Sequence, residues 1–193
     1  MTAAVIPGVS RDLPTDDASV TAATRAWLER AVIGLNLCPF AKAVHVKDQL
    51  RYVVSAATTP EALLAELESE LQFLAAADPE QVEMTLLIHP QVLQDFLDYN
   101  DFLDVADAAV ERLALDGELQ IASFHPDYQF AGSDADDIAN FSNRSPYPTL
   151  HLLRESSIDA AVATFPDAAD IYERNIETLE RLGPAGWAAL FRA

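Results

Sequence analysis

Two of the four histidines end strand-like apolar runs in the same way. Residues 84–90 read MTLLIHP and residues 119–126 read LQIASFHP, so His89 and His125 each precede a proline. Neighbouring parallel strands bring their carboxyl ends to one sheet edge, where open α/β sheets bind ligands. Because imidazole titrates near neutral pH, His125 and His89 are the candidate catalytic groups for proton transfer. A strand end also tolerates any polar residue, so a structural role for each histidine stays open.

The basic residues gather in two stretches of an acidic chain. The 193 residues hold 12 Lys and Arg against 31 Asp and Glu, a formal net charge of −19. Five of the basic residues and one acid, Asp48, fall within 38–55 and 138–154: Lys42, Lys47, Arg51, Arg144 and Arg154. A positive patch in an acidic protein attracts small anions, and guanidinium suits carboxylate and phosphate. Arg144, Arg154 and Lys42 are therefore candidate substrate-binding residues, unless they pair with surface acids instead.

A long connection at 125–148 contains further polar candidates. It ends in NFSNRSPYP, where two prolines stiffen a backbone rich in hydrogen-bonding side chains. Asn143 and Tyr128 would orient a substrate there, and His151 follows in the next element. A recognition loop fits this pattern, and so does a structural loop that cross-links itself. Its several aromatic residues indicate that the connection is ordered and packed over the sheet.

Metal and cofactor chemistry finds little support in the sequence. Cys38, His89, His125 and His151 are zinc-type ligands, but no two of them have chelate spacing. Cys38 is expected to be a buried structural residue, because it follows a helix C-terminus where the dipole disfavours a thiolate. No phosphate-binding or dinucleotide-binding glycine motif occurs. We therefore expect no bound metal and no cofactor.

The composition excludes several classes of partner and compartment. So acidic a surface repels nucleic acid and anionic membranes, so neither is an expected partner. One cysteine allows no disulfide within the chain. The N-terminal residues MTAAVIPGVSRDLP lack the basic start and apolar stretch of a signal peptide, and a cytoplasmic location is expected.

The elements that must position these residues alternate between strand and helix patterns. Residues 1–15 are predicted to be a flexible tail, and 16–193 a single domain. Strands are expected at 50–56, 84–90, 119–126 and 149–155, the last with a helix as the alternative. Helices are expected from Asp17 to Cys38, from Thr59 to Asp78, from Asn100 or Asp101 to Leu115, from Ser156, and from about Asp167 to Leu182. In a strand the odd offset of His151 and Arg154 places them on opposite faces, whereas a helix would place them on one.

This alternation predicts an α/β fold: one domain with about four strands in a parallel or mixed sheet, flanked by helices and ending in a helical C-terminal cap. The segments GLNLCPFAK (34–42), SFHPDYQFAG (123–132), NRSPYP (143–148) and TLHLLRE (149–155) together resemble the bacterial domain-of-unknown-function family 1415. The resemblance implies a single α/β-type domain of about this length. It supplies no activity and no catalytic residues.

The leading functional hypothesis is a small-molecule enzyme that binds an anionic substrate, a phosphate or carboxylate, in a basic pocket at the sheet edge. One alternative is a non-catalytic module that binds an anionic metabolite or a protein. A second alternative is a metal-dependent hydrolase with Cys and His ligands, which requires at least three of the four zinc-type ligands to converge.

Overall fold

The last strand of the chain lies inside the sheet. The computed structural model describes residues 13–164 and 171–192. Its four strands are β1 (Leu50–Val54), β2 (Met84–Ile88), β3 (Leu119–Phe124) and β4 (Thr149–Arg154), in the spatial order β1-β2-β4-β3. β1 and β2 are parallel, and β4 is antiparallel to both β2 and β3. The sheet is thus mixed, and the segment after the long connection is a strand rather than a helix.

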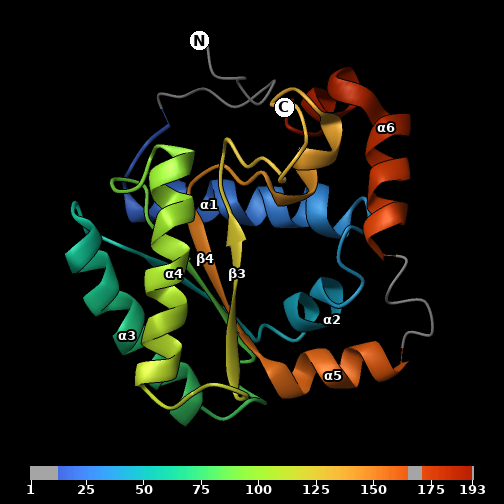
Figure 1. Cartoon of the computed structure of the whole chain (residues 1–193). Helices are drawn as coiled ribbons and strands as arrows, with labels where there is room; N and C mark the ends of the chain where they lie inside the picture. Colours follow the sequence, from blue (N-terminus) through green and yellow to red (C-terminus); the bar gives the residue numbers. More distant parts are fainter. Residues whose placement is uncertain (1–12, 165–170, 193) are drawn as a thin grey trace.

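Helices cover both faces of this sheet (Figure 1). They are α1 (Asp17–Trp27), the π-helix η1 (Leu28–Ile33), α2 (Ala41–Val46), α3 (Pro60–Ala76), α4 (Phe96–Arg112), the 3-10 helix η2 (Ile138–Asn143), α5 (Glu155–Thr164) and α6 (Ile171–Leu190). α3 and α4 pack on one face, while α1 and η1 pack on the other, the side on which α2, α5 and α6 also lie. α6 is kinked at Gly183, where φ is 64°, and continues to Leu190, beyond the end predicted at Leu182. Within the described residues no helix combines the length and the apolar character needed to cross a bilayer.

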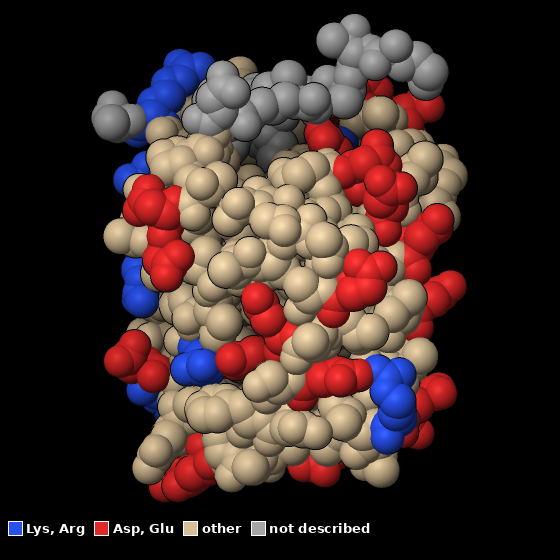
Figure 2. Space-filling model, turned by 90° about the vertical axis from the view of Figure 1, so that its left-hand side faces the viewer, with Lys and Arg blue, Asp and Glu red and all other residues tan. Residues whose placement is uncertain are grey.

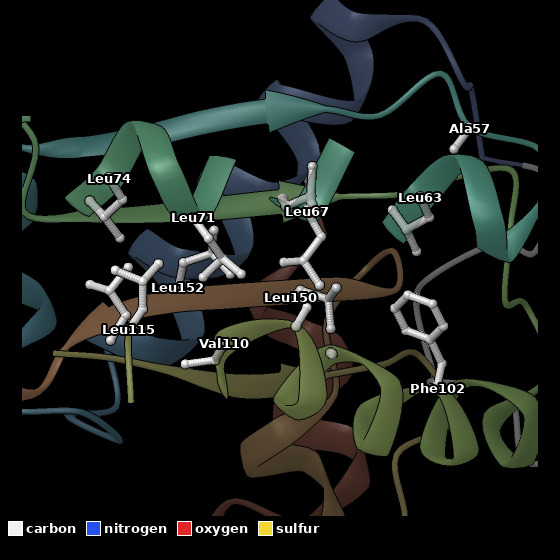
Figure 3. Packing of buried hydrophobic residues seen from close by; sticks show 14 of the residues in the cluster. Ala57, Leu63, Leu67, Leu71, Leu74, Phe102, Val110, Leu115, Leu150 and Leu152 are labelled. Carbon is white, nitrogen blue, oxygen red and sulfur yellow. The ribbon is translucent and has the colours of Figure 1, made fainter. Parts of the chain in front are cut away.

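The larger hydrophobic core lies between the sheet and the α3/α4 layer. Figure 3 shows Leu63, Leu67, Leu71 and Leu74 of α3 directed toward the strands, where they are fully buried. Their spacing of four, four and three residues forms one helical stripe. Leu150 and Leu152 of β4 meet them from the sheet. Because strand residues alternate between faces, His151 points to the opposite side.

Two further predicted helix boundaries are wrong. α4 begins at Phe96, not at Asn100 or Asp101, because the Asp95 carboxylate accepts hydrogen bonds from the backbone N–H groups of Leu97 and Asp98. The first helix does not continue in α form to Cys38, because it changes to the π form at Leu28 and ends at Ile33.

Part of the segment predicted as a tail contacts the domain. Residues 1–12 lie outside the described residues. Leu13 packs beside a buried cluster that includes Val20 and Tyr147, and the Tyr147 hydroxyl donates a 2.7 Å hydrogen bond to the Pro14 carbonyl. The predicted helix start near Asp167 also lies outside the described residues.

A buried tyrosine of α4 joins the ends of β3 and β4. The Tyr99 hydroxyl donates a 2.9 Å hydrogen bond to the Thr149 carbonyl and accepts a 3.2 Å bond from the Phe124 N–H. Phe124 and Thr149 are register partners, so the hydroxyl bridges the last pair of this ladder. It therefore fixes α4 to the sheet edge at which His89 and His125 lie.

Tyr99→Phe should destabilise the fold without changing it. Removal of the hydroxyl leaves a buried carbonyl and a partly buried N–H without their partner, at a cost of about 1–3 kcal/mol in the free energy of unfolding. Urea denaturation followed by circular dichroism measures that change. Tyr172→Phe, which removes a hydroxyl from a 54% exposed side chain of α6, is the matched control. Equal midpoints for the two variants would contradict the bridging role.

Candidate functional site

His89 and His125 meet at one sheet edge, although their strands are not neighbours. β4 separates β2 from β3, and its antiparallel course leaves those two strands running in the same direction. Tyr99 of α4 contacts both histidines, with ring centroids 5.7 Å from His89 and 5.0 Å from His125. The predicted convergence at the edge is therefore present, with a tyrosine ring between the imidazoles.

The polar contacts of these histidines are mostly with the backbone. His89 Nδ1 lies 3.0 Å from the Val92 carbonyl, so this nitrogen carries the proton. His125 donates from Nε2 to the Leu93 carbonyl over 3.2 Å and accepts the Asp127 N–H at Nδ1. Of the four ring nitrogens, only Nε2 of His89 is buried without a partner. Both rings are thus fixed as neutral imidazoles that hold loop backbone.

Burial lowers the pKa of His89 and of His125 to about 4, since a charged imidazole loses its hydration there. The Val92 and Leu93 carbonyls act in the opposite direction but are weaker. At neutral pH neither ring exchanges a proton readily. The sheet edge is therefore better suited to hold structure than to transfer protons.

Arg144, Asn143 and Tyr128 cross-link the long connection. Arg144 is 2% exposed, and its guanidinium donates to the carbonyls of Tyr128 and Ala135 at 3.0 and 2.6 Å and lies 4.5 Å over the Phe141 ring. Burial lowers the pKa of Arg144, while the nearby negative charges of two aspartates, 127 and 136, raise it. Asn143 donates to the Ser123 carbonyl. Of the two interpretations of this loop, the contacts favour the structural one.

Arg154 lies at the other end of β4 from Arg144. Its Nη2 is 2.6 Å from the Leu74 carbonyl and 2.8 Å from the Ala77 carbonyl, so it satisfies the C-terminus of α3. The six residues of β4 span about 20 Å between the two arginines, too far for one small anion to contact both. The structure does not bring them together.

Arg51 and Lys42 lie apart from Arg144 and Arg154. Arg51 forms a two-pronged ion pair with Glu70 of α3, at 3.0 and 3.1 Å, and Lys42 is exposed on α2. On the α3/α4 face of the molecule, basic side chains are interspersed with acidic and uncharged ones and form no continuous positive surface (Figure 2). One residue of each positive stretch, Lys47 and Arg154, lines the cavity described below, but Lys42, Arg51 and Arg144 do not, so the two stretches as a whole do not build one basic pocket.

A large cavity lies on the opposite face of the sheet, between α1, η1, α2 and α5. Its volume is about 820 Å³. Most of its lining residues are apolar, including Trp27, Leu28, Val32, Pro39, Phe40, Ala43, Val44, Leu50, Met84, Leu86, Ala122, Phe124, Leu153 and Ile158. Its polar lining residues are Lys47, Gln49, Glu80, Glu83, His151, Arg154 and Ser157. Of the predicted site residues, the cavity includes His151 and Arg154.

The π-helix forms part of the cavity wall. Leu28 and Val32 of η1 line the cavity, and the Leu37 N–H bonds to the Val32 carbonyl five residues back. A Cβ atom at Gly34 would lie 2.2 Å from the Arg30 carbonyl oxygen, so the end of η1 requires glycine. π-Helical turns are rare and occur frequently at functional sites. This wall therefore has a backbone form that packing alone does not favour.

Three polarisable side chains border the cavity. His151 Nε2 lies 3.1 Å from Met84 Sδ, and the half-buried, free Cys38 lines the same space. The expectation that Cys38 is buried is thus only partly met. His89 and His125 contact α4 on the other face, so the four zinc-type ligands do not converge. The described residues hold no group of three or more His, Cys, Asp or Glu side chains placed to bind a metal ion.

Comparison with known proteins identifies the family of the chain but does not indicate a function. The family profile described as "Protein of unknown function (DUF1415)" matches residues 19–189. The chain belongs to this family. No curated protein and no solved structure matches the DUF1415 chain significantly. The resemblance seen in the sequence is confirmed over most of its length, and the site must be argued from geometry.

The cavity escaped prediction because apolar lining residues leave the same sequence pattern as core residues. Within GLNLCPFAK, however, Cys38 and its neighbours from Pro39 to Ala41 all line it. The available signal was an apolar segment interrupted by Pro39, which follows a helical pattern and cannot continue it as a core helix.

The DUF1415 protein should lose stability as the pH falls below neutral. The pKa of each of His89, His125 and His151 is lowered by burial to about 4 from an ordinary value of 6.5. Between these values the unfolded chain binds more protons than the folded one. The free energy of unfolding therefore falls with pH across that window, by about 1.4 kcal/mol per pH unit for each histidine.

Urea denaturation at several pH values between about 4.5 and 7 measures this slope. His151→Phe should reduce the slope of the free energy of unfolding against pH by about 1.4 kcal/mol per pH unit, the contribution of one histidine. His45→Phe is the control, because His45 lies outside the cavity on α2 and pairs with Glu29 at 3.4 Å. A slope for His151→Phe equal to that of the unsubstituted protein would contradict the assignment of His151 as a neutral imidazole whose pKa is lowered on folding.

Proposed function

We propose that this protein binds a small, predominantly apolar molecule in the cavity between the sheet and α2. The observation that carries the proposal is the cavity itself, about 820 Å³ with mostly apolar walls. Small-molecule sites typically have volumes of about 300–1,000 Å³, apolar walls and few polar groups. Apolar walls around open space lose the packing contacts that an occupant of the same character would restore.

The polar lining residues indicate how a ligand enters. Lys47 and Glu80 are exposed, so their side of the cavity is open to solvent. α2 lies beside this opening and has no buried residue of its own. A ligand that passes between α2 and the segment before β2 would reach the sheet without any rearrangement of the α3/α4 core.

Binding is better supported than catalysis. Two of the side chains that line the cavity, His151 and Cys38, are candidate proton-transfer or nucleophilic groups, but desolvation keeps the His151 imidazole neutral by lowering its pKa. An enzyme acting on an anionic substrate at the histidine edge has less support. There the Arg144 Nε and Nη2 donate to backbone carbonyls, and the charges of aspartates 127 and 136 oppose an incoming anion. The non-catalytic alternative is therefore preferred, with an apolar rather than an anionic ligand.

Nile red, a neutral apolar dye, should bind the protein with a rise in fluorescence, and Ala122→Leu should weaken this binding about tenfold. Ala122 lines the cavity in register with His151, and added methylenes in an occupied site cost about 1–3 kcal/mol. The same substitution at Ala108, which is exposed on α4, is the control and should leave the affinity unchanged.

Fluorescence titration gives the affinities, and circular dichroism establishes that each variant is folded. Absence of dye binding to the unsubstituted protein would overturn the proposal. So would equal affinities for the Ala122→Leu and Ala108→Leu variants, because the dye would then occupy some other surface.

A further inference from the structure

His151 is a hydrogen-bonding group set among apolar neighbours on the cavity floor. It lies at the middle of β4, with Leu86 of β2 and Ala122 of β3 as its register partners. All three line the cavity. The side chain is half-buried, and a polar group among apolar neighbours gains free energy when it finds a hydrogen-bond partner.

The contact with Met84 fixes the position of the ring proton. A thioether sulfur accepts but cannot donate a hydrogen bond, so Nε2 of His151, 3.1 Å from Met84 Sδ, carries the proton. A neutral imidazole has one N–H, so Nδ1 presents a lone pair. Within residues 13–164 and 171–192, no backbone or side-chain group donates to Nδ1. Among these described residues Nδ1 of the cavity-lining His151 thus has no donor, and it remains able to accept a hydrogen bond from a ligand.

Aromatic rings stand next to this acceptor. The Phe124 ring is 5.8 Å from the His151 ring, at an interplanar angle of 34°. The Trp27 ring is 5.1 Å from Phe124 in an edge-on arrangement, and Trp27 also lines the cavity. Rings arranged in this way favour another flat ring through offset or edge contacts.

We propose that the cavity takes a neutral aromatic molecule that carries a hydroxyl group, and that Nδ1 of His151 accepts the hydroxyl proton while Trp27 and Phe124 contact the ring. This assignment rests on the proposed function and specifies its ligand class. A carboxylate fits less well, because two acceptors would face each other at Nδ1. An aliphatic chain would gain nothing from the acceptor.

The test compares two ligands of similar shape that differ in the donor. 2-Naphthol has a hydroxyl group, whereas 2-methoxynaphthalene has none, and each competes with Nile red for the cavity. The unsubstituted protein should bind 2-naphthol about tenfold more tightly, the effect of one buried hydrogen bond. His151→Phe should abolish this preference, and His45→Phe should retain it.

The possible results separate this inference from the proposed function. If Nile red binds but the unsubstituted protein does not prefer 2-naphthol, the assignment of an aromatic alcohol as the ligand is wrong, while the proposal that the cavity binds an apolar molecule remains. A preference that persists in His151→Phe also overturns it. Tighter displacement of the dye by dodecanoic acid than by 2-naphthol would replace the ligand class with an aliphatic one. His151→Leu serves as a second variant should His151→Phe not fold.

Discussion

The insertion of β4 between β2 and β3 is the constraint on which the rest of the structure depends. β2 and β3 have no hydrogen bonds to each other, so the sheet is incomplete until the last strand pairs with both. Its antiparallel course brings the carboxyl ends of β2 and β3 to one edge, where Tyr99 contacts both histidines. Its alternation places Leu150 and Leu152 in the α3/α4 core and His151 in the cavity. One strand therefore determines both the packed face and the open face of the molecule.

The sequence predicted local structure better than strand order. Each strand was found because apolar β-forming runs end in turn residues, and α3 because Thr59, Pro60 and its leucine stripe agree. The start of α4 was misplaced because several aspartates offer equivalent caps. Packing of Tyr99 against the sheet selects Asp95, and no local pattern shows that. Strand order was missed for a similar reason, since β4 pairs with residues far away in the chain.

Charge was the least reliable guide to the site. The sequence showed where basic residues cluster along the chain but not which groups accept their hydrogen bonds. Arg144 and Arg154 donate chiefly to backbone carbonyls, acceptors that every residue carries and no composition reveals. The histidines at the sheet edge were correctly placed, yet loop carbonyls hold both rings. Polar residues that recur at strand ends can thus serve to hydrogen-bond loop backbone groups as readily as to take part in catalysis.

The cavity combines features that a purely structural face would not retain. A tighter wall would bury more apolar surface and gain packing energy, because protein interiors are close-packed. Here η1 instead keeps a π-helical form that depends on Gly34, and α2 remains without a buried residue. His151 adds a half-buried imidazole whose lowered pKa makes it costly in acid. A leucine at this position would remove that cost and leave the β4 pairing intact. The π-helix, the helix without a buried residue and the half-buried imidazole all border the same cavity, and each is unfavourable for stability. A bound ligand that contacts all three would compensate for these costs together, whereas packing alone would need a separate explanation for each.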